Sequence, residues 1–324
     1  MKKTILILAT VMLILMLCTE ISSSELQKSI VPADAHWVIH VNVEKIKTTR
    51  FFSAFKEEEL FAKVEKRGAW LEKRFRFNPL EDAKGITLFG KKGEEDAVVC
   101  VHGNFDKDHL LSLLAFDEDH EELTYGKYTL HNWDNDSYGV FVRDDLVMIS
   151  ESEAAIKVAL DVLAGNAKTI TSSPLNSLIQ QVPTGAFLTG AAGNIAALLE
   201  GEHDKEAAIL KKTEAAVFSL REAGKNMSMN LNMKTADPKD AENIAQIVRG
   251  LLAMADMYKD QIPAQIKLPN DIKTSVKGNN VNIDINYPVE DLVQLIYNSG
   301  KLGKLDIDFD DFSIRNSCPF TKEI

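Results

Sequence analysis

The sequence predicts an α+β protein of two related lobes, each a mainly antiparallel sheet with helices packed on one face. Short runs that alternate apolar and polar residues predict the strands, and helix-like segments follow them. The same order of segments occurs in both halves of the chain, which indicates an internal duplication. The 324 residues are enough to bury a sizeable core and favour two domains over one.

The two copies are most alike at their centres, where each has two strand-like runs before a helix. These runs are 86–89 with 97–105, and 216–220 with 227–233. Asp106 and Asp237 are the expected N-caps of the helices that follow, and Pro238 fits a first helical position. Both copies are therefore predicted to run strand, turn, strand, helix.

The last third of each copy also matches. The first copy has strand-like runs at 128–133, 138–142 and 146–149, and the second has them at 272–277 and 281–287. Ser150 and Glu153 have capping-box spacing before a helix over 154–163, which Gly165 ends. Gly278-Asn279-Asn280 is typical of a hairpin turn, and Pro288 is expected to start a helix over 289–297.

Each copy opens with Val-Pro and an extended run, at 31–43 and at 182–191. The first copy carries an additional charged amphipathic helix over 56–77. We expect this organisation: a signal peptide (1–24), an N-terminal α+β lobe (25–168), a linker (169–181), a C-terminal α+β lobe (182–298), and an acidic tail or final strand (299–324).

The first 24 residues have the pattern of an export signal. Lys2 and Lys3 precede an apolar run too short to span a bilayer as a helix, and small serines follow it. Cleavage after Ser24 would leave a soluble body in the periplasm or outside the cell. Two alternatives remain, a retained N-terminal anchor and a lipoprotein acylated at Cys18, although Leu17 is large for the second.

Composition limits the partners. The formal charge of −11 argues against nucleic acid and against electrostatic docking on anionic membranes, and no other apolar run has membrane length. After cleavage only Cys100 and Cys318 remain. Export would permit a disulfide between them, but Cys100 lies in an apolar strand where it would pack as a small hydrophobe.

The histidines suggest two metal sites, neither of which the sequence favours. His36 and His40 share one side of the first predicted strand, where half-buried packing is the simpler account. His109 and His120 bracket a Leu-rich helix beside the acidic run 117–122, so a zinc site is conceivable. That acidic composition is more typical of a solvated loop.

Two acidic segments resemble calcium sites only in outline. Asp134, Asp136 and Asp145 have partial calcium-loop spacing, but Tyr138 takes a ligand position and the flanks are strand-like, which favours a hairpin turn. The acidic run 306–311 of the tail is expected to be a solvated strand face. The aromatic residues Trp70, Trp133 and Tyr138 are candidates for contact, with core or edge packing as the simpler account.

The chain has no Gly-x-Ser-x-Gly elbow, no Ser-x-x-Lys with its companion motifs, no His-Glu-x-x-His and no phosphate-binding glycine loop. We therefore assign no catalytic, cofactor-binding or metal-binding residue and expect no cofactor. An enzyme with dispersed catalytic groups stays open.

The block Val31-Pro-Ala-Asp-Ala35, the apolar strand ending at Val41-Asn42-Val43 and the short helix after it resemble exported bacterial proteins of uncharacterised function, found for example in planctomycetes. The match covers about 25 residues. It implies an envelope location and a two-lobed α+β body, and it brings no assigned active residues. We expect an exported, non-enzymatic protein that binds a protein or envelope component; the alternatives are an exported hydrolase and a weak divalent-metal-binding protein.

Overall fold

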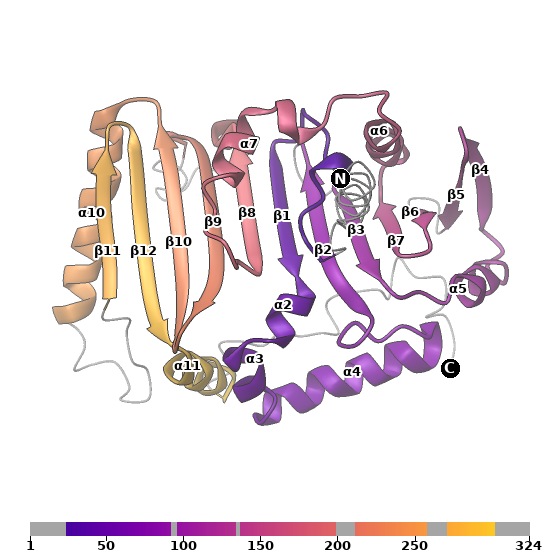
Figure 1. The fold of residues 1–324 in the computed structure, drawn as a ribbon, viewed down its shortest axis with the longest axis horizontal. Helices are drawn as coiled ribbons and strands as arrows, with labels where there is room; N and C mark the ends of the chain where they lie inside the picture. The colour runs from indigo at the N-terminus through magenta and orange to yellow at the C-terminus, as the bar shows by residue number, and fades with distance from the viewer. Residues whose placement is uncertain (1–23, 92–95, 134–136, 199–210, 258–270, 302–324) are drawn as a thin grey trace, which may run out of the picture.

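The computed structural model of the chain describes residues 24–91, 96–133, 137–198, 211–257 and 271–301 (Figure 1). Within these ranges the protein is mixed α/β, with a large antiparallel sheet and helices packed against it, which confirms the α+β prediction at this level.

The strands are β1 (Trp37–Asn42), β2 (Ala83–Gly90), β3 (Val98–Gly103), β4 (Glu121–Tyr125), β5 (Tyr128–Trp133), β6 (Ser137–Arg143), β7 (Leu146–Ser150), β8 (Leu188–Gly193), β9 (Thr213–Ala223), β10 (Asn226–Thr235), β11 (Asp271–Lys277) and β12 (Asn280–Pro288). The α-helices are α2 (Val43–Lys47), α3 (Arg50–Phe55), α4 (Glu59–Phe75), α5 (Lys107–Leu114), α6 (Glu153–Leu163), α7 (Pro174–Ile179), α8 (Ile195–Leu198), α10 (Pro238–Met257) and α11 (Val289–Lys301), with 3₁₀ turns η1 (Lys28–Ile30) and η2 (Ile170–Ser172).

The described strands form a single sheet in the order β11-β12-β10-β9-β8-β1-β2-β3-β7-β6-β5-β4. Each neighbouring pair is antiparallel, and β1 meets β8 in a register that runs from Trp37↔Ala192 to Val41↔Leu188. The expectation of a separate sheet in each lobe is corrected by this contact. Pairing β1 with β8 satisfies backbone groups that two separate sheets would leave unpaired at their edges.

The helices lie at distinct places along this sheet (Figure 1). α10 packs against β10, β11 and β12, α6 against β3, β6 and β7, and α7 against β8 and β9. α2, α3, α4 and α11 lie towards the opposite ends of the strands from α6 and α7. No helix within the described residues is both long and apolar enough to cross a membrane.

Two buried clusters form the core. The larger one runs through both halves of the sheet, because Val38 of β1 and Ala191 of β8 belong to it together with Leu175 of α7 and Ile156 of α6. The smaller one lies beneath α10 and contains Ala241, Ile244 and Ala245 on the helix and Met233, Val281 and Ile283 on the strands. The junction between β1 and β8 is therefore sealed by side chains as well as by backbone pairing.

The N-cap residues in the sequence predicted the start of two helices, α5 and α10, correctly. The Asp106 carboxylate accepts from the His109 N–H at 3.0 Å, and Asp237 accepts from the Asp240 N–H at 2.9 Å. The cap of α6 differs from the prediction, because its N-cap is Ser152, which accepts from the Ala155 N–H, and the helix begins at Glu153. The Ser150 hydroxyl instead donates to the Ala97 carbonyl.

The hairpin predicted at Gly278 is confirmed, since β11 pairs with β12 around Gly278 with φ 60°. The segment 169–181, predicted as a linker, contains η2 and α7, and Leu175, Leu178 and Ile179 are buried in the main core. The predicted helix over 56–77 corresponds to α4.

Several sequence predictions fall outside the described residues. Asp134 and Asp136 of the calcium-like loop, the acidic run 306–311 and Cys318 are among them. Cys100 is buried in β3 and makes no disulfide with another described residue.

Gly190 gives a test of the central packing. A Cβ there would lie 2.0 Å from Cε1 of the Phe218 ring on β9, so Gly190→Ala should lower the free energy of unfolding by about 1–3 kcal/mol. Gly250→Ala is the matched control: it adds a Cβ with nothing within 4 Å in the exposed interior of α10 and should raise stability by about 0.5–1 kcal/mol. Urea unfolding measures both, and equal effects would contradict the packing.

Candidate functional site

A hollow of about 420 Å³ lies where the two halves of the sheet join. Its walls come from the entry to β1, the end of β8, β9, β10 and one side of α7. Leu175 and Leu178 of α7 contribute apolar surface, while His36, Glu214 and Lys234 contribute polar groups. This volume lies within the range of about 300–1,000 Å³ that is usual for small-molecule sites.

The segment 31–36 separates this hollow from a second one and is held on both sides by backbone hydrogen bonds. The Ala33 N–H donates to the Lys168 carbonyl at 2.9 Å, and the Val31 carbonyl accepts from the Ile170 N–H at 2.8 Å. His36 donates to Gly90 of β2 and accepts from Gly193 of β8. This segment therefore forms a fixed wall between two hollows.

The polar groups of the larger hollow are partly committed to one another. Lys234 Nζ pairs with a Glu214 carboxylate oxygen at 3.0 Å. His36 Nδ1 is a buried atom without a hydrogen-bond partner in the structure. Asn194 has φ 51°, a left-handed conformation that Asn tolerates better than most residues. An unpartnered buried nitrogen is costly, and this one is closed off from the hollow, which His36 lines with other atoms.

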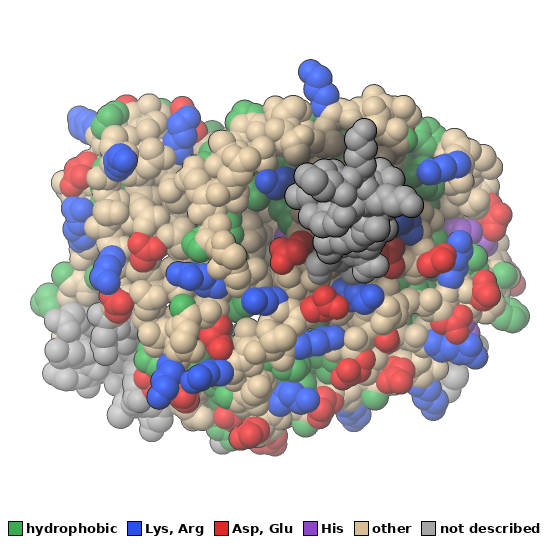
Figure 2. All heavy atoms as spheres, in the orientation of Figure 1, with side chains coloured by type: hydrophobic (Ala, Val, Ile, Leu, Met, Phe, Trp, Pro, Cys, Tyr) green, Lys and Arg blue, Asp and Glu red, His purple; other side chains and the backbone are tan. Residues whose placement is uncertain are grey.

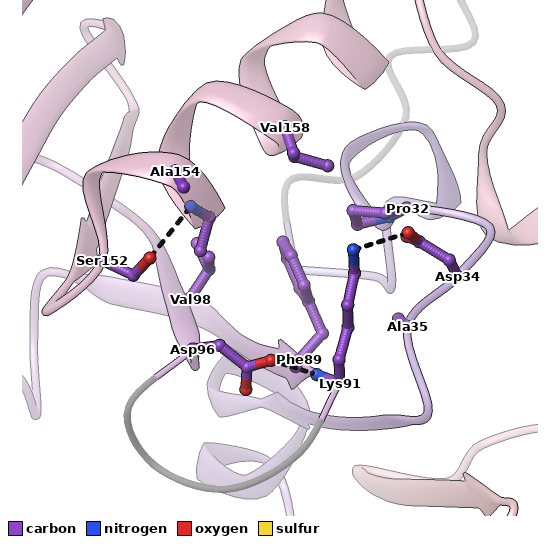
Figure 3. Close-up of a pocket in the computed structure, with 12 residues that line it drawn as sticks. Pro32, Asp34, Ala35, Phe89, Lys91, Asp96, Val98, Ser152, Ala154 and Val158 are labelled. Atoms are coloured by element: carbon purple, nitrogen blue, oxygen red, sulfur yellow. Dashed lines mark hydrogen bonds and ion pairs between the residues drawn. The ribbon is translucent and has the colours of Figure 1, made fainter.

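The second hollow, about 160 Å³, lies between the same segment and the N-terminal end of α6 (Figure 3). Phe89 and Val98 supply apolar surface, and Lys91 reaches across to pair with the Asp34 carboxylate at 2.6 Å. The Lys91 N–H also donates to Asp96. Its volume and this bridging ion pair make it a poorer ligand site than the larger hollow.

A serine hydrolase would need Asp, His and Ser side chains to converge in one pocket. Asp34, His36 and Ser177 all line the larger hollow, but Asp34 and Ser177 each interact with a different residue instead of with His36. The Ser177 hydroxyl donates to the Pro174 carbonyl at 2.7 Å, and Asp34 pairs with Lys91 on the side of the second hollow. No hydrogen bond joins these three side chains in the described part of the chain, so they do not form a nucleophile–base pair.

A separate cluster of side chains that can bind a metal ion, His120, Glu122 and His131, lies at the hairpin of β4 and β5. His120 Nε2 is 3.1 Å from His131 Nδ1, and Glu122 Oε1 is 3.8 Å from the same nitrogen. Burial lowers the pKa of His131, while the nearby Glu122 carboxylate opposes that shift. The sequence singled out His120 and Glu122 but missed His131, which lies within the predicted strand 128–133.

The two histidine pairs considered from the sequence do not form. His109 Nε2 bonds to the Arg74 carbonyl at 3.0 Å, and the groups that meet His120 are Glu122 and His131. His40 is buried and bonds to the Thr87 hydroxyl and the Ser24 carbonyl, whereas His36 precedes β1 and faces the larger hollow. His36 and His40 therefore have different surroundings.

The aromatic candidates have packing partners. Trp70 is 38% exposed and lies edge-on to Phe75, with Arg67 4.5 Å from its ring centre. The Trp133 indole lies over Gly139, where a Cβ would come within 2.7 Å of it. Tyr138 packs against the main core.

α10 carries a second apolar row on its solvent side. Ile247, Leu251, Met254 and Met257 are 41, 60, 55 and 77% exposed at spacings of three and four residues. Exposed apolar surface of this kind often marks a contact region, although nothing in the described residues shows what covers it. Elsewhere, Figure 2 shows lysine, arginine and acidic side chains interspersed over the viewed face, without a patch of one sign.

No protein-family model matches the sequence, and a comparison with curated proteins finds no match. Among solved structures, crystal form III of TP0453 is similar with a TM-score of 0.46 and 10% identity, covering 85% of this chain and 99% of that one. Crystal form I gives the same TM-score and identity with 85% and 98% coverage, and crystal form IV gives 0.45 with 83% and 95% coverage.

His102 on β3 is an unusual core residue outside these sites. It is fully buried, and neither ring nitrogen has a hydrogen-bond partner in the structure. Burial is the main reason that its pKa falls from 6.5 to about 4; the charge of Arg143 acts in the same direction and that of Asp145 opposes it. The folded protein therefore holds His102 neutral where the unfolded chain would bind a proton.

This difference predicts a pH dependence of stability. Because the folded pKa lies below the unfolded one, the free energy of unfolding should fall as the pH falls from about 6.5 to about 4, by about 3 kcal/mol over the whole window. His102→Leu should reduce that fall. Urea unfolding at several pH values measures it, and an H102L variant with the same steepness as the wild type would contradict the prediction.

Proposed function

We propose that the protein is exported to the bacterial cell envelope or beyond it and acts there as a non-enzymatic binding protein. The observation that carries the binding role is the hollow of about 420 Å³ between α7 and the central strands. It combines apolar walls with a few polar groups, as ligand sites usually do. The separate commitments of Asp34 and Ser177 favour binding over hydrolysis.

We further propose that the two halves arose by duplication. The strand order β1-β2-β3-β7-β6 of the first half parallels β8-β9-β10-β12-β11 of the second, counted outward from their junction. In each half, one helix follows the third strand of this order: α5 follows β3, and α10 follows β10. Another helix follows the strand that comes last of these along the chain: α6 follows β7, and α11 follows β12. In this view the hairpin β4–β5 is an addition to the first half, and the hollow lies on the junction of the copies.

The occupant that we propose is another protein or an envelope component that inserts a mainly apolar group beside Leu175 and Leu178. The polar end of that group would lie beside His36, Glu214 and Lys234, the polar residues of the opposite wall. The Lys234–Glu214 pair is neutral as a unit, so the hollow does not select strongly for net charge.

Two variants in and beside α7 test this role. Ser177 is exposed and lines the hollow, so Ser177→Trp should obstruct its mouth and abolish ligand capture. Gln180, the residue that follows α7, is exposed and does not line the hollow, so Gln180→Trp should leave capture unchanged. The immobilised proteins would be incubated with detergent-solubilised envelope extract, and bound components quantified by mass spectrometry. The proposal fails if no component distinguishes the wild type from S177W.

Export predicts a processed N-terminus. Mass spectrometry of the protein recovered from the envelope or medium should find a chain that starts near Glu25, because the small residue Ser24 suits cleavage by a signal peptidase. A lipid on Cys18 would instead indicate a tethered protein. An intact Met1 on cytoplasmic protein would contradict export.

A further inference from the structure

We propose that His120, Glu122 and His131 form a zinc-binding site on the edge hairpin β4–β5. The ligand atoms of the three side chains all lie within 4.8 Å of one another. This inference depends on the hairpin alone and is independent of the proposed binding role of the larger hollow.

The pairing of the hairpin explains why these residues meet. Glu122 lies directly opposite His131 in the register of β4 and β5. His120 immediately precedes β4, and its Nε2 lies 3.1 Å from His131 Nδ1, which places its side chain beside that of His131. All three side chains therefore share one face of the hairpin, opposite to the face on which Leu123 and Leu130 pair.

The distances suit a tetrahedral ion. Two nitrogen ligands that are each about 2.0–2.1 Å from zinc lie about 3.3 Å apart. The observed separation of His120 Nε2 and His131 Nδ1 is 3.1 Å, and Glu122 Oε1 is 3.8 Å from His131 Nδ1. Small rotations of the exposed Glu122 side chain are enough to bring its oxygen to the same centre, since this side chain is 64% exposed.

The donor set favours a transition metal such as zinc over calcium and magnesium; copper, nickel and ferrous iron also accept this set. Two imidazoles and one carboxylate suit zinc, whereas calcium and magnesium prefer oxygen ligands alone. Three protein ligands leave one position of the ion for water, and the exposed Glu122 provides the side of entry. His131, with 8% of its side chain exposed, anchors the site in the sheet.

The site would join the edge strand β4 to its neighbour β5. An edge strand has one unpaired side, and β4 is the terminal strand of the sheet. A ligand that binds the folded but not the unfolded state stabilises the fold in proportion to the logarithm of its concentration above the dissociation constant. Zinc should therefore raise the thermal unfolding midpoint of the protein.

The test is calorimetric titration of the purified protein, without a histidine tag, with zinc and with calcium. The wild type should bind one zinc ion per chain and show no heat with calcium. Removal of a supporting partner of a metal ligand already costs about 10–100-fold in affinity, so His120→Gln and Glu122→Gln should each weaken zinc binding by at least about tenfold. Glu121→Gln is the matched control, because Glu121 is adjacent, exposed and on the other face of β4.

The thermal readout separates a site from incidental binding. At the same zinc concentration, the zinc-induced shift of the midpoint should be unchanged in E121Q and smaller in H120Q and E122Q. Absence of zinc binding by the wild type would overturn the proposal, as would equal affinities in E121Q, E122Q and H120Q. Loss in H120Q with an unchanged E122Q would remove Glu122 from the site and overturn the three-ligand assignment.

Discussion

The antiparallel contact between β1 and β8 is the constraint on which the rest of the structure depends. It pairs residues 37–41 with 188–192 and joins both halves of the chain into one sheet. Small residues make the pairs on either side of this contact tight: a Cβ at Gly90 of β2 would lie 2.9 Å from the Trp37 ring of β1, and one at Gly190 of β8 would collide with Phe218 of β9. Without this pairing, each half would expose a central strand edge, and the larger core cluster would divide.

The position of the larger hollow follows from the same contact. β1 and β8 run antiparallel, so the start of one and the end of the other lie at the same end of the sheet, where His36 and Gly193 are hydrogen-bonded. α7 packs beside that end without filling it, because its apolar residues are directed into the core and Ser173 and Ser177 remain near the surface. A segment that reads in the sequence as a polar connection thus supplies one wall of the candidate site.

The sequence predicted the structural features that depend on residues close together in the chain. It missed those that depend on contacts between residues far apart in the chain. Asp106, Pro238 and Gly278 act through caps and turn conformations within a few residues, and all three positions were predicted correctly. The β1–β8 pairing joins segments about 150 residues apart, and nothing in either segment alone identifies its partner. The larger hollow was not predicted, because its walls come from five separate elements.

Whether the cluster of His120, Glu122 and His131 can be predicted depends on recognising one strand, β4. Residues 117–122 read as a solvated acidic loop, yet 121–125 form β4 because Leu123 and Tyr125 pack on the main core while Glu122 and Thr124 face the other way. The alternation was present in the sequence, but the acidic run obscured it. With β4 recognised, a two-residue turn at Gly126-Lys127 pairs Tyr125 with Tyr128 and, three steps along, Glu122 with His131. The ligand that the sequence reading missed was therefore determined by the register of a hairpin, and a register is fixed by its turn and its buried face.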